Sequence, residues 1–235
     1  MSKSNNMILN IILCVRNEEK TIKIIIDKIL NLKISNVIIK TIVVDNCSTD
    51  KTKKILQKIK NKNIKIIFQK KNIGKGHSVK TAINLCKGDF IIPQDADLEY
   101  DPKYIKNIVE YALKYRLDFV IGSRVKKNKR FHKYLINEIG ANALTFFFNM
   151  IFFSNFTDVA SCYKLMNLKI LKKFNLKCNG FDLDYELAAK FVKKRYKYGE
   201  VPIKYKSRSY KEGRKTKIFI DGIKAFFVII KERIL

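Results

Sequence analysis

Proline and glycine are scarce in this chain of 235 residues, which contains 3 prolines and 9 glycines. No Pro/Gly-rich linker, internal repeat or low-complexity run divides the sequence. We therefore predict one domain over residues 1–235, a length that can bury a sizeable core. The hydrophobic content of 47% argues against an intrinsically disordered chain.

The cysteine patterns of disulfide frameworks and zinc sites are also missing from the sequence. The five cysteines are an odd number, are scattered along the chain and form no C-x-x-C pair. They are Cys14, Cys47, Cys86, Cys162 and Cys178. This usage fits small buried thiols in a reducing compartment.

Long uninterrupted apolar runs are lacking as well. No apolar run reaches the roughly 18–20 residues that a membrane-spanning helix needs. The first twelve residues, MSKSNNMILNII, are too short and too polar for a signal peptide. We predict a cytoplasmic protein, which peripheral contacts could still hold at the inner face of a membrane.

Acidic residues are outnumbered, because 49 Lys and Arg face 21 Asp and Glu and leave a net charge of +28. Such a charge attracts nucleic acids, anionic membranes or phosphorylated substrates, although part of it can simply cover solvated faces. The sequence has no helix-turn-helix, RNP-type or zinc-finger pattern. We therefore expect no nucleic-acid partner.

Short apolar runs alternate with longer, lysine-rich stretches of helical period. The predicted strands cover residues 7–15, 41–44, 64–68, 90–92 and 119–121. The predicted helices cover residues 20–30, 51–59, 78–86 and 103–115. This alternation predicts an α/β fold with a mainly parallel central sheet and helices on both faces.

The second half of the chain has a different character. Residues 126–133 form a basic cluster, and residues 144–156 contain six phenylalanines. The mixture returns in residues 217–235. One interpretation is a pair of amphipathic helices lying in a membrane interface, and the alternative is helices buried against the sheet.

Polar clusters follow three of the predicted strands. They are residues 16–18, residues 45–46 and residues 95–97. Because ligands bind beyond the carboxyl ends of parallel strands, we expect these clusters to meet at one site. Nearby acids have simpler roles, since Asp50 or Ser48 is expected to cap a helix and Asp101 precedes a proline at a helix start.

Asp95, Asp97 and Glu99 are spaced two residues apart in a chain that is otherwise cationic. Neighbouring carboxylates repel one another unless a positive ligand lies between them. Their hard oxygen atoms suit Mg²⁺ or Mn²⁺ bridging a diphosphate, although a surface acidic turn is the alternative. The glycines around Lys75, in NIGKG, allow a close backbone turn that could bring this lysine near a phosphate.

Eight segments in this order resemble the inverting family 2 glycosyltransferases. The first five are NEE (17–19), VVDNCSTD (43–50), NIGKG (72–76), DADLEYDP (95–102) and GSR (122–124). The others are TDVASCYKLM (157–166), GFDLDYELAAK (180–190) and RSYKEGRKTK (208–217). These three look like the branch that contains dolichyl-phosphate mannose synthase and bacterial polyprenyl-phosphate relatives, and the match covers about residues 7–225.

The resemblance implies a GT-A, Rossmann-like fold that binds a nucleotide-diphosphate sugar over about residues 7–125, with an acceptor and membrane-interface part over about 126–235. In the family pattern, Arg16, Glu18 and Asp45 would surround the base and ribose, and Lys75 is a further donor-binding candidate. Asp95 and Ala96 would border the nucleotide, while Asp97 and Glu99 would hold Mg²⁺ or Mn²⁺. Departures from the family pattern, including Cys14, Asn46, Cys47 and Lys164, leave the nucleotide open more than the reaction class.

The implied reaction is sugar transfer with inversion to a polyprenyl phosphate, with Asp97 and Arg124 in catalytic roles. The candidates to hold the acceptor phosphate are Arg124, Lys133, Lys164, Arg208, Arg214 and Lys215. The alternative is a hydroxyl acceptor in surface polysaccharide or glycolipid synthesis, which needs a carboxylate base. Asp184 or Glu186 would be that base, although acids here also fit the first turn of a helix.

Overall fold

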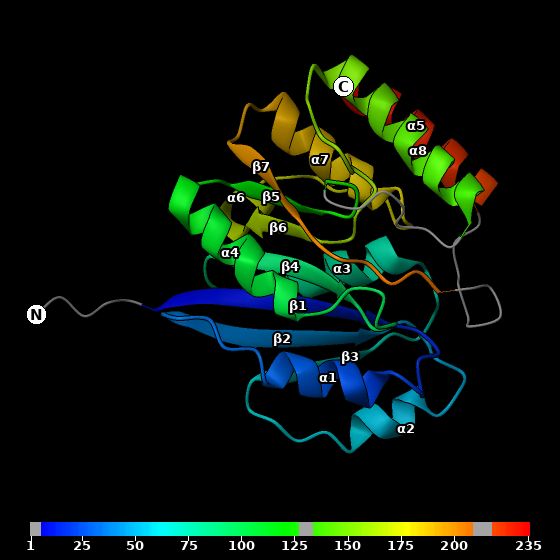
Figure 1. Ribbon diagram of the computed structural model, residues 1–235. Coiled ribbons are helices and arrows are strands. Elements are labelled where there is room, and N and C mark those ends of the chain that lie inside the picture. Colours follow the sequence, from blue (N-terminus) through cyan, green and yellow to red (C-terminus); the bar gives the residue numbers. More distant parts are fainter. Residues whose placement is uncertain (1–5, 127–133, 209–217) are drawn as a thin grey trace, which may run out of the picture.

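The computed structural model describes residues 6–126, 134–208 and 218–235. Among these residues, seven strands form one sheet in the order β3-β2-β1-β4-β6-β5-β7 (Figure 1). The strands are β1 Met7–Val15, β2 Val37–Asp45, β3 Ile64–Phe68, β4 Phe90–Asp95, β5 Phe119–Ser123, β6 Lys164–Asn167 and β7 Tyr198–Pro202. Only β6 runs against its neighbours β4 and β5, so the predicted mainly parallel sheet is confirmed.

Helices cover both faces of this sheet (Figure 1). They are α1 Ile22–Leu30, α2 Thr52–Gln57, α3 Lys75–Ile83, α4 Lys103–Tyr115, α5 Leu135–Phe152, α6 Leu168–Leu171, α7 Leu183–Lys193 and α8 Ile218–Ile234. The side chains of β1 alternate between two cores. Leu9 and Leu13 pack with α1 and α4, whereas Ile12 packs with α3 and α7. A strand buried on both faces explains why its sequence reads as a continuous apolar run.

The predicted element boundaries needed small corrections. The helix expected over residues 78–86 begins at Lys75, directly after Gly74, whose φ of 129° is one that other residues rarely adopt. The strands expected over 41–44 and 90–92 extend to Asp45 and Asp95. Asp101 stabilises the first turn of α4 as expected, because its carboxylate accepts the Lys103 amide.

The aromatic second half forms a layer of two parallel helices, α5 and α8, which lie side by side beyond α7 (Figure 1). Phe147 stacks on Phe226 at 4.7 Å between ring centroids, and Arg233 lies over the Phe153 ring. Phe148 is buried in the core, so α5 does pack toward the sheet. Large apolar side chains remain exposed on both helices: Leu135, Ile136, Ile139, Phe146 and Met150 on α5, and Phe219, Ile220, Ile223, Phe226, Phe227 and Ile234 on α8.

The expectation that no segment is long and apolar enough to span a membrane was wrong for α5. This helix of 18 residues meets that criterion by length and composition, and 22% of it is buried within the protein. The helix has apolar residues on all its faces, and Glu138 is its single charged residue. This composition explains why it meets the criterion for a spanning helix. Length alone does not decide between a spanning helix and an interface helix.

Candidate active site

A cavity of about 270 Å³ lies beyond the carboxyl ends of β1, β2 and β4. The strand-end residues that were expected to converge do so, because Arg16, Glu18, Asn46, Asp95 and Asp97 all line it. The cavity continues from these polar groups to the first turns of α5 and α8. Its lining on that side consists of Asn137, Gly140, Ala141, Leu144, Asp221 and Gly222.

The acidic loop after β4 carries three carboxylates into the cavity. Asp95 forms an ion pair with Lys75 at 2.6 Å between Oδ1 and Nζ. Asp97 folds back on the loop, where its Oδ1 accepts the Glu99 amide at 3.0 Å. Leu98 between them has a φ of 65°, an uncommon value for a non-glycine residue, and this turn helps to bring the two acids together.

Arg208 completes this acidic cluster from a distant part of the sequence. Its Nη2 lies 3.1 Å from Asp97 Oδ2, and its Nη1 lies 3.2 Å from Glu18 Oε2. The Arg208 amide donates to Glu99 Oε1 at 2.6 Å, while the Tyr205 hydroxyl donates to Glu99 Oε2 at 2.5 Å. Residues 205–208 therefore contact Glu18, Asp97 and Glu99, whereas Asp95 pairs with Lys75.

Burial, together with the neighbouring charges of Asp95 and Glu99, raises the pKa of Asp97 to about 7, against the opposing effect of Arg208. The positive charge near these carboxylates is therefore too small for all of them to be ionised without a cost in free energy. Within the described ranges, no three His, Cys, Asp or Glu side chains by themselves gather into a metal site. Two carboxylates beside a cavity nevertheless fit Mg²⁺ or Mn²⁺, which take further ligands from water and substrate phosphates.

The loops after β1 and β2 hold one another in place at the end of the cavity where Glu18 lies. The Asn17 amide donates to Ser48 Oγ, and the Thr49 amide donates to Asn17 Oδ1 at 2.8 Å. The Arg16 guanidinium donates to the Asn46 carbonyl oxygen at 3.2 Å. This end presents a cation, a carboxylate from Glu18 and amide groups to a ligand.

Asp45 does not line the cavity, contrary to the expectation that it contacts the base and ribose. It is 1% exposed, and its carboxylate accepts both the hydroxyl and the amide of Ser48. The side chain therefore shapes the loop after β2. Asn46, the next residue, takes the place on the cavity wall, and its buried Oδ1 has no hydrogen-bond partner within the described residues.

Lys75, the predicted donor-binding lysine, lines the cavity. The glycines beside it permit a close approach of α3 to residues 178–180, because a Cβ at Gly74 or Gly76 would lie 2.2 or 2.8 Å from the Asn179 carbonyl group. Burial lowers the Lys75 pKa, but Asp95 outweighs it and the pKa rises well above its usual value. The ammonium therefore stays charged beside the acidic loop.

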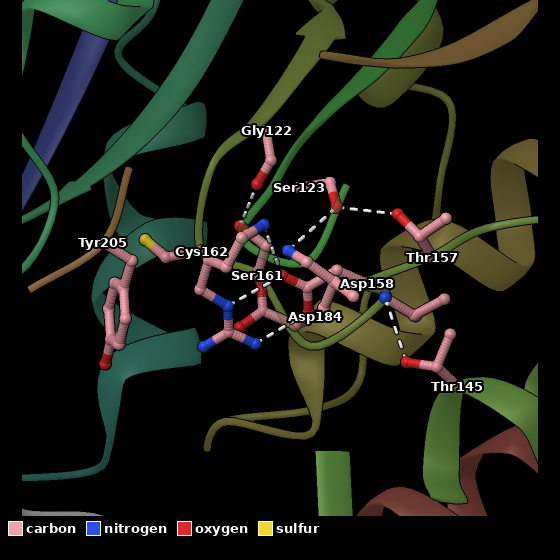
Figure 2. Close-up of polar contacts among 12 residues, drawn as sticks. Gly122, Ser123, Thr145, Thr157, Asp158, Ser161, Cys162, Asp184 and Tyr205 are labelled. Atoms are coloured by element: carbon pink, nitrogen blue, oxygen red, sulfur yellow. Dashed lines mark hydrogen bonds and ion pairs between the residues drawn. The ribbon is translucent and has the colours of Figure 1, made fainter. Parts of the chain in front are cut away.

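Arg124 lies on the cavity wall in a buried, two-pronged ion pair with Asp158. The Nε and Nη2 atoms each lie 2.7 Å from a carboxylate oxygen, and the guanidinium also lies over the Tyr205 ring. Figure 2 shows the surrounding contacts, in which Ser123 bonds to Thr157 and Ser161 bonds to the Gly122 carbonyl. Asp158 was not predicted as a site residue, although it lies in the TDVASC segment.

Lys164 is not placed to hold an acceptor phosphate, contrary to the prediction. The side chain is fully buried, and its ammonium donates to the carbonyl oxygens of Val159 and Ser161 and to Asp184. Burial lowers its pKa, and Asp184 opposes this effect. Lys164 therefore joins the loop before β6 to the start of α7.

The two predicted base candidates have different environments. Asp184 lines the cavity and pairs with Lys164 at 3.1 Å. Glu186 is fully buried outside the cavity, where its carboxylate accepts the amides of Lys177 and Cys178 at 2.8 Å each. Glu186 is therefore not accessible to a substrate, and the prediction that it could act as a base was wrong.

Three of the predicted acceptor-phosphate residues, Lys133, Arg214 and Lys215, lie outside the described residues. Tyr205 was not predicted, although it contacts both Glu99 and Arg124. No motif marks this tyrosine in the sequence. Its position before the RSYKEG segment is the only signal that could have found it.

Comparisons with known proteins agree with this arrangement. Residues 10–174 match the family model of glycosyl transferase family 2. UDP-N-acetylglucosamine–dolichyl-phosphate N-acetylglucosaminyltransferase of Methanococcus voltae is 26% identical over 95% of each chain. An uncharacterized protein of Methanocaldococcus jannaschii is 30% identical over 93% of this chain and 89% of its own.

Solved structures show the same fold at lower sequence identity. Glucosyl-3-phosphoglycerate synthase from Mycobacterium tuberculosis, in complex with UDP, has a TM-score of 0.75 and 16% identity over 97% of this chain and 81% of that chain. The same enzyme with Mn²⁺, UDP and glucosyl-3-phosphoglycerate has a TM-score of 0.73. The family match, the relatives and the GT-A sheet with its acidic loop together identify the chain as a member of glycosyltransferase family 2.

Proposed function

We propose that this glycosyltransferase transfers a sugar, with inversion, from a nucleotide-diphosphate sugar to a polyprenyl phosphate at the cytoplasmic face of a membrane. The observation that carries the proposal is the shape of the cavity. It runs from the acidic loop at Asp97 to the first turns of α5 and α8, whose outer faces are apolar. One end therefore suits a nucleotide sugar and the other suits a lipid. The similarity to a dolichyl-phosphate transferase supports this acceptor class.

The donor is proposed to bind at the carboxyl ends of β1 and β4. Arg16 and Glu18 would contact the base and ribose, while Asp95 and Ala96 would border the nucleotide. Lys75, which is charged and lies 2.6 Å from Asp95, is placed to bind the diphosphate. A solved structure of the same fold in complex with UDP supports a nucleotide donor.

Asp97 and Glu99 would hold Mg²⁺ or Mn²⁺. A cation there supplies positive charge that neutralises the nucleoside diphosphate as it leaves, which lowers the barrier electrostatically. Mn²⁺ and Mg²⁺ accompany UDP in the structures of glucosyl-3-phosphoglycerate synthase. The role of these two residues is to fix the diphosphate so that the anomeric carbon faces the acceptor end of the cavity.

The acceptor phosphate needs positive charge more than it needs a base. A phosphate monoester is largely ionised at pH 7, because its second pKa is about 6, so its oxygen can attack without losing a proton first. Arg124 and Arg208 bring guanidinium groups to the cavity wall. Lys133, Arg214 and Lys215 remain predicted contributors to phosphate binding.

A hydroxyl acceptor is the second candidate, and it is supported by Asp184. This carboxylate lines the cavity and could accept a proton from a sugar hydroxyl. Its carboxylate also lies 3.1 Å from the Lys164 ammonium, which holds it in place at the cavity wall. Surface polysaccharide or glycolipid synthesis would use this chemistry.

Peripheral membrane contact is proposed for the layer of α5 and α8. Eleven large apolar side chains on these two helices are exposed, while Phe148 and Phe152 of α5 and Ala225 and Ile229 of α8 are buried in the core. A helix with a core-facing side and an apolar outer side fits the membrane interface. The net charge of +28 would add attraction to anionic lipids.

The direct test is a transfer assay with purified protein, labelled UDP- and GDP-sugars, and polyprenyl phosphate in detergent or vesicles. We expect a lipid-linked product that requires Mn²⁺ or Mg²⁺ and disappears with EDTA. Polyprenol, which lacks the phosphate, is the matched control and should accept no sugar. Transfer to polyprenol or to a soluble sugar, with none to polyprenyl phosphate, would favour the hydroxyl acceptor instead.

A further inference from the structure

The Arg208 side chain lies where positive charge is needed most, among the carboxylates of the proposed metal site. Its guanidinium bridges Asp97 at 3.1 Å and Glu18 at 3.2 Å. The distance from its Nε to Glu99 Oε1 is 3.8 Å. The side chain is 17% exposed, so these contacts are made largely away from solvent.

The chain around Arg208 is fixed to the acidic loop independently of this guanidinium. The Lys206 amide donates to the Glu99 carbonyl oxygen at 3.0 Å, and Tyr205 packs against Tyr100 with 4.9 Å between ring centroids. Tyr100 and Tyr205 also form an isolated β-bridge. The backbone therefore stays beside the acidic loop, while the long arginine side chain can change its rotamer.

The acidic oxygens near Arg208 already accept hydrogen bonds. Asp97 uses Oδ2 for the guanidinium and Oδ1 for the Glu99 amide. Glu99 accepts the Arg208 amide and the Tyr205 hydroxyl. A divalent cation that binds Asp97 must replace one of these hydrogen-bond donors at a carboxylate oxygen. The positive charge of the nearby Arg208 guanidinium also repels the cation.

We propose that Arg208 acts as an internal counterion that competes with the divalent metal for Asp97. The proposal rests on the proposed metal-dependent transfer and deepens it, because it predicts weak metal binding in the absence of the donor. Donor phosphates add ligands and negative charge, so metal and nucleotide would bind together. The guanidinium displaced from Asp97 would remain at the cavity wall, within reach of a phosphate.

The test is direct Mn²⁺ binding to the protein without nucleotide, measured by calorimetry or by the loss of the free Mn²⁺ electron paramagnetic resonance signal. Arg208→Gln removes the competing charge but keeps the Arg208 backbone amide on Glu99. We expect its dissociation constant for Mn²⁺ to be about tenfold lower than that of the wild type, which corresponds to about 1.4 kcal/mol. An unchanged or higher constant in a folded Arg208→Gln variant would overturn the proposal.

Two further variants separate competition from a general change of charge. Arg208→Lys keeps the positive charge and should bind Mn²⁺ with a constant nearer the wild-type value than that of Arg208→Gln. Arg16→Gln removes a different arginine from the cavity wall and changes its charge by the same unit. If Arg16→Gln tightened Mn²⁺ binding as much as Arg208→Gln, the competition at Asp97 would be refuted. The transfer assay separately tests the proposed function, because metal affinity here is measured without donor or acceptor.

Discussion

Gly222 offers a way to block the acceptor end of the cavity without disturbing the fold. This glycine lies in α8 and lines the cavity, and a Cβ added there would have no atom within 4 Å. Gly222→Leu therefore adds a side chain to open space that we assign to the lipid. The variant should fold normally but bind a polyprenyl phosphate poorly.

Gly222→Leu is expected to stabilise the fold and to weaken the binding of the acceptor. Replacing glycine within a helix stabilises it by roughly 0.5–1 kcal/mol, which raises the melting temperature of a protein of this size by about 1–4 °C. A side chain that occupies space needed by a ligand costs roughly 1–3 kcal/mol, by analogy with overpacked cores. The KM for polyprenyl phosphate should therefore rise by roughly 5- to 150-fold.

The assay compares KM for the acceptor, donor binding by thermal shift, and the melting temperature in the same preparations. Gly222→Ala should fall between the wild type and Gly222→Leu. Ile223→Leu places a leucine at the neighbouring position, whose side chain is 58% exposed, and is the matched control with an unchanged KM. A stable Gly222→Leu variant with wild-type KM for the lipid phosphate would refute the assignment of this space to the acceptor.

Three other variants separate catalytic from structural acids. Asp97→Asn should lower the kcat of metal-dependent transfer by more than tenfold, because its carboxylate is proposed to bind the cation. The protein should remain folded. The transfer assay measures kcat, and circular dichroism measures the fold. Glu186→Gln should lower the free energy of unfolding by roughly 1–3 kcal/mol in urea, because the carboxylate accepts two backbone amides and glutamine keeps only one acceptor oxygen for them. Asp158→Asn should cost roughly 3–5 kcal/mol in the same experiment, because it breaks the buried ion pair with Arg124.

Each of these variants has an outcome that would contradict its assignment. Metal-dependent transfer at the wild-type rate by Asp97→Asn would remove this residue from the proposed metal site. Glu186→Gln that kept full stability but lost turnover would restore its role as a base. Unchanged stability of Asp158→Asn would mean that the ion pair with Arg124 contributes little to folding. The control is Asp118→Asn, which makes the same substitution at an acid outside this buried pair.

The positions of the strands and of the acidic loop could be predicted because they depend on local pattern. Apolar runs such as residues 7–15 identify strands that are buried on both faces, and polar residues directly after them lie at the carboxyl edge. Asp95, Asp97 and Glu99 were found in this way. Their convergence with Arg16 and Glu18 followed from the parallel order of the strands.

The roles that failed depend on tertiary contacts that no local pattern encodes. Glu186 lies in the first turns of α7, but its direction toward the Lys177 and Cys178 amides is visible only in the folded chain. Lys164 was predicted to hold the acceptor phosphate, yet its ammonium is enclosed by carbonyl groups. The contact between Glu18 and Arg208 joins residues 190 positions apart, a separation beyond the range of motif spacing.

Metal-dependent transfer of a labelled sugar to polyprenyl phosphate tests the central claim most directly. Purified wild-type protein should form a lipid-linked sugar with Mn²⁺ or Mg²⁺, form none with EDTA, and form none on polyprenol. A protein that binds the donor but gives no lipid-linked product with any UDP- or GDP-sugar would contradict the proposed function.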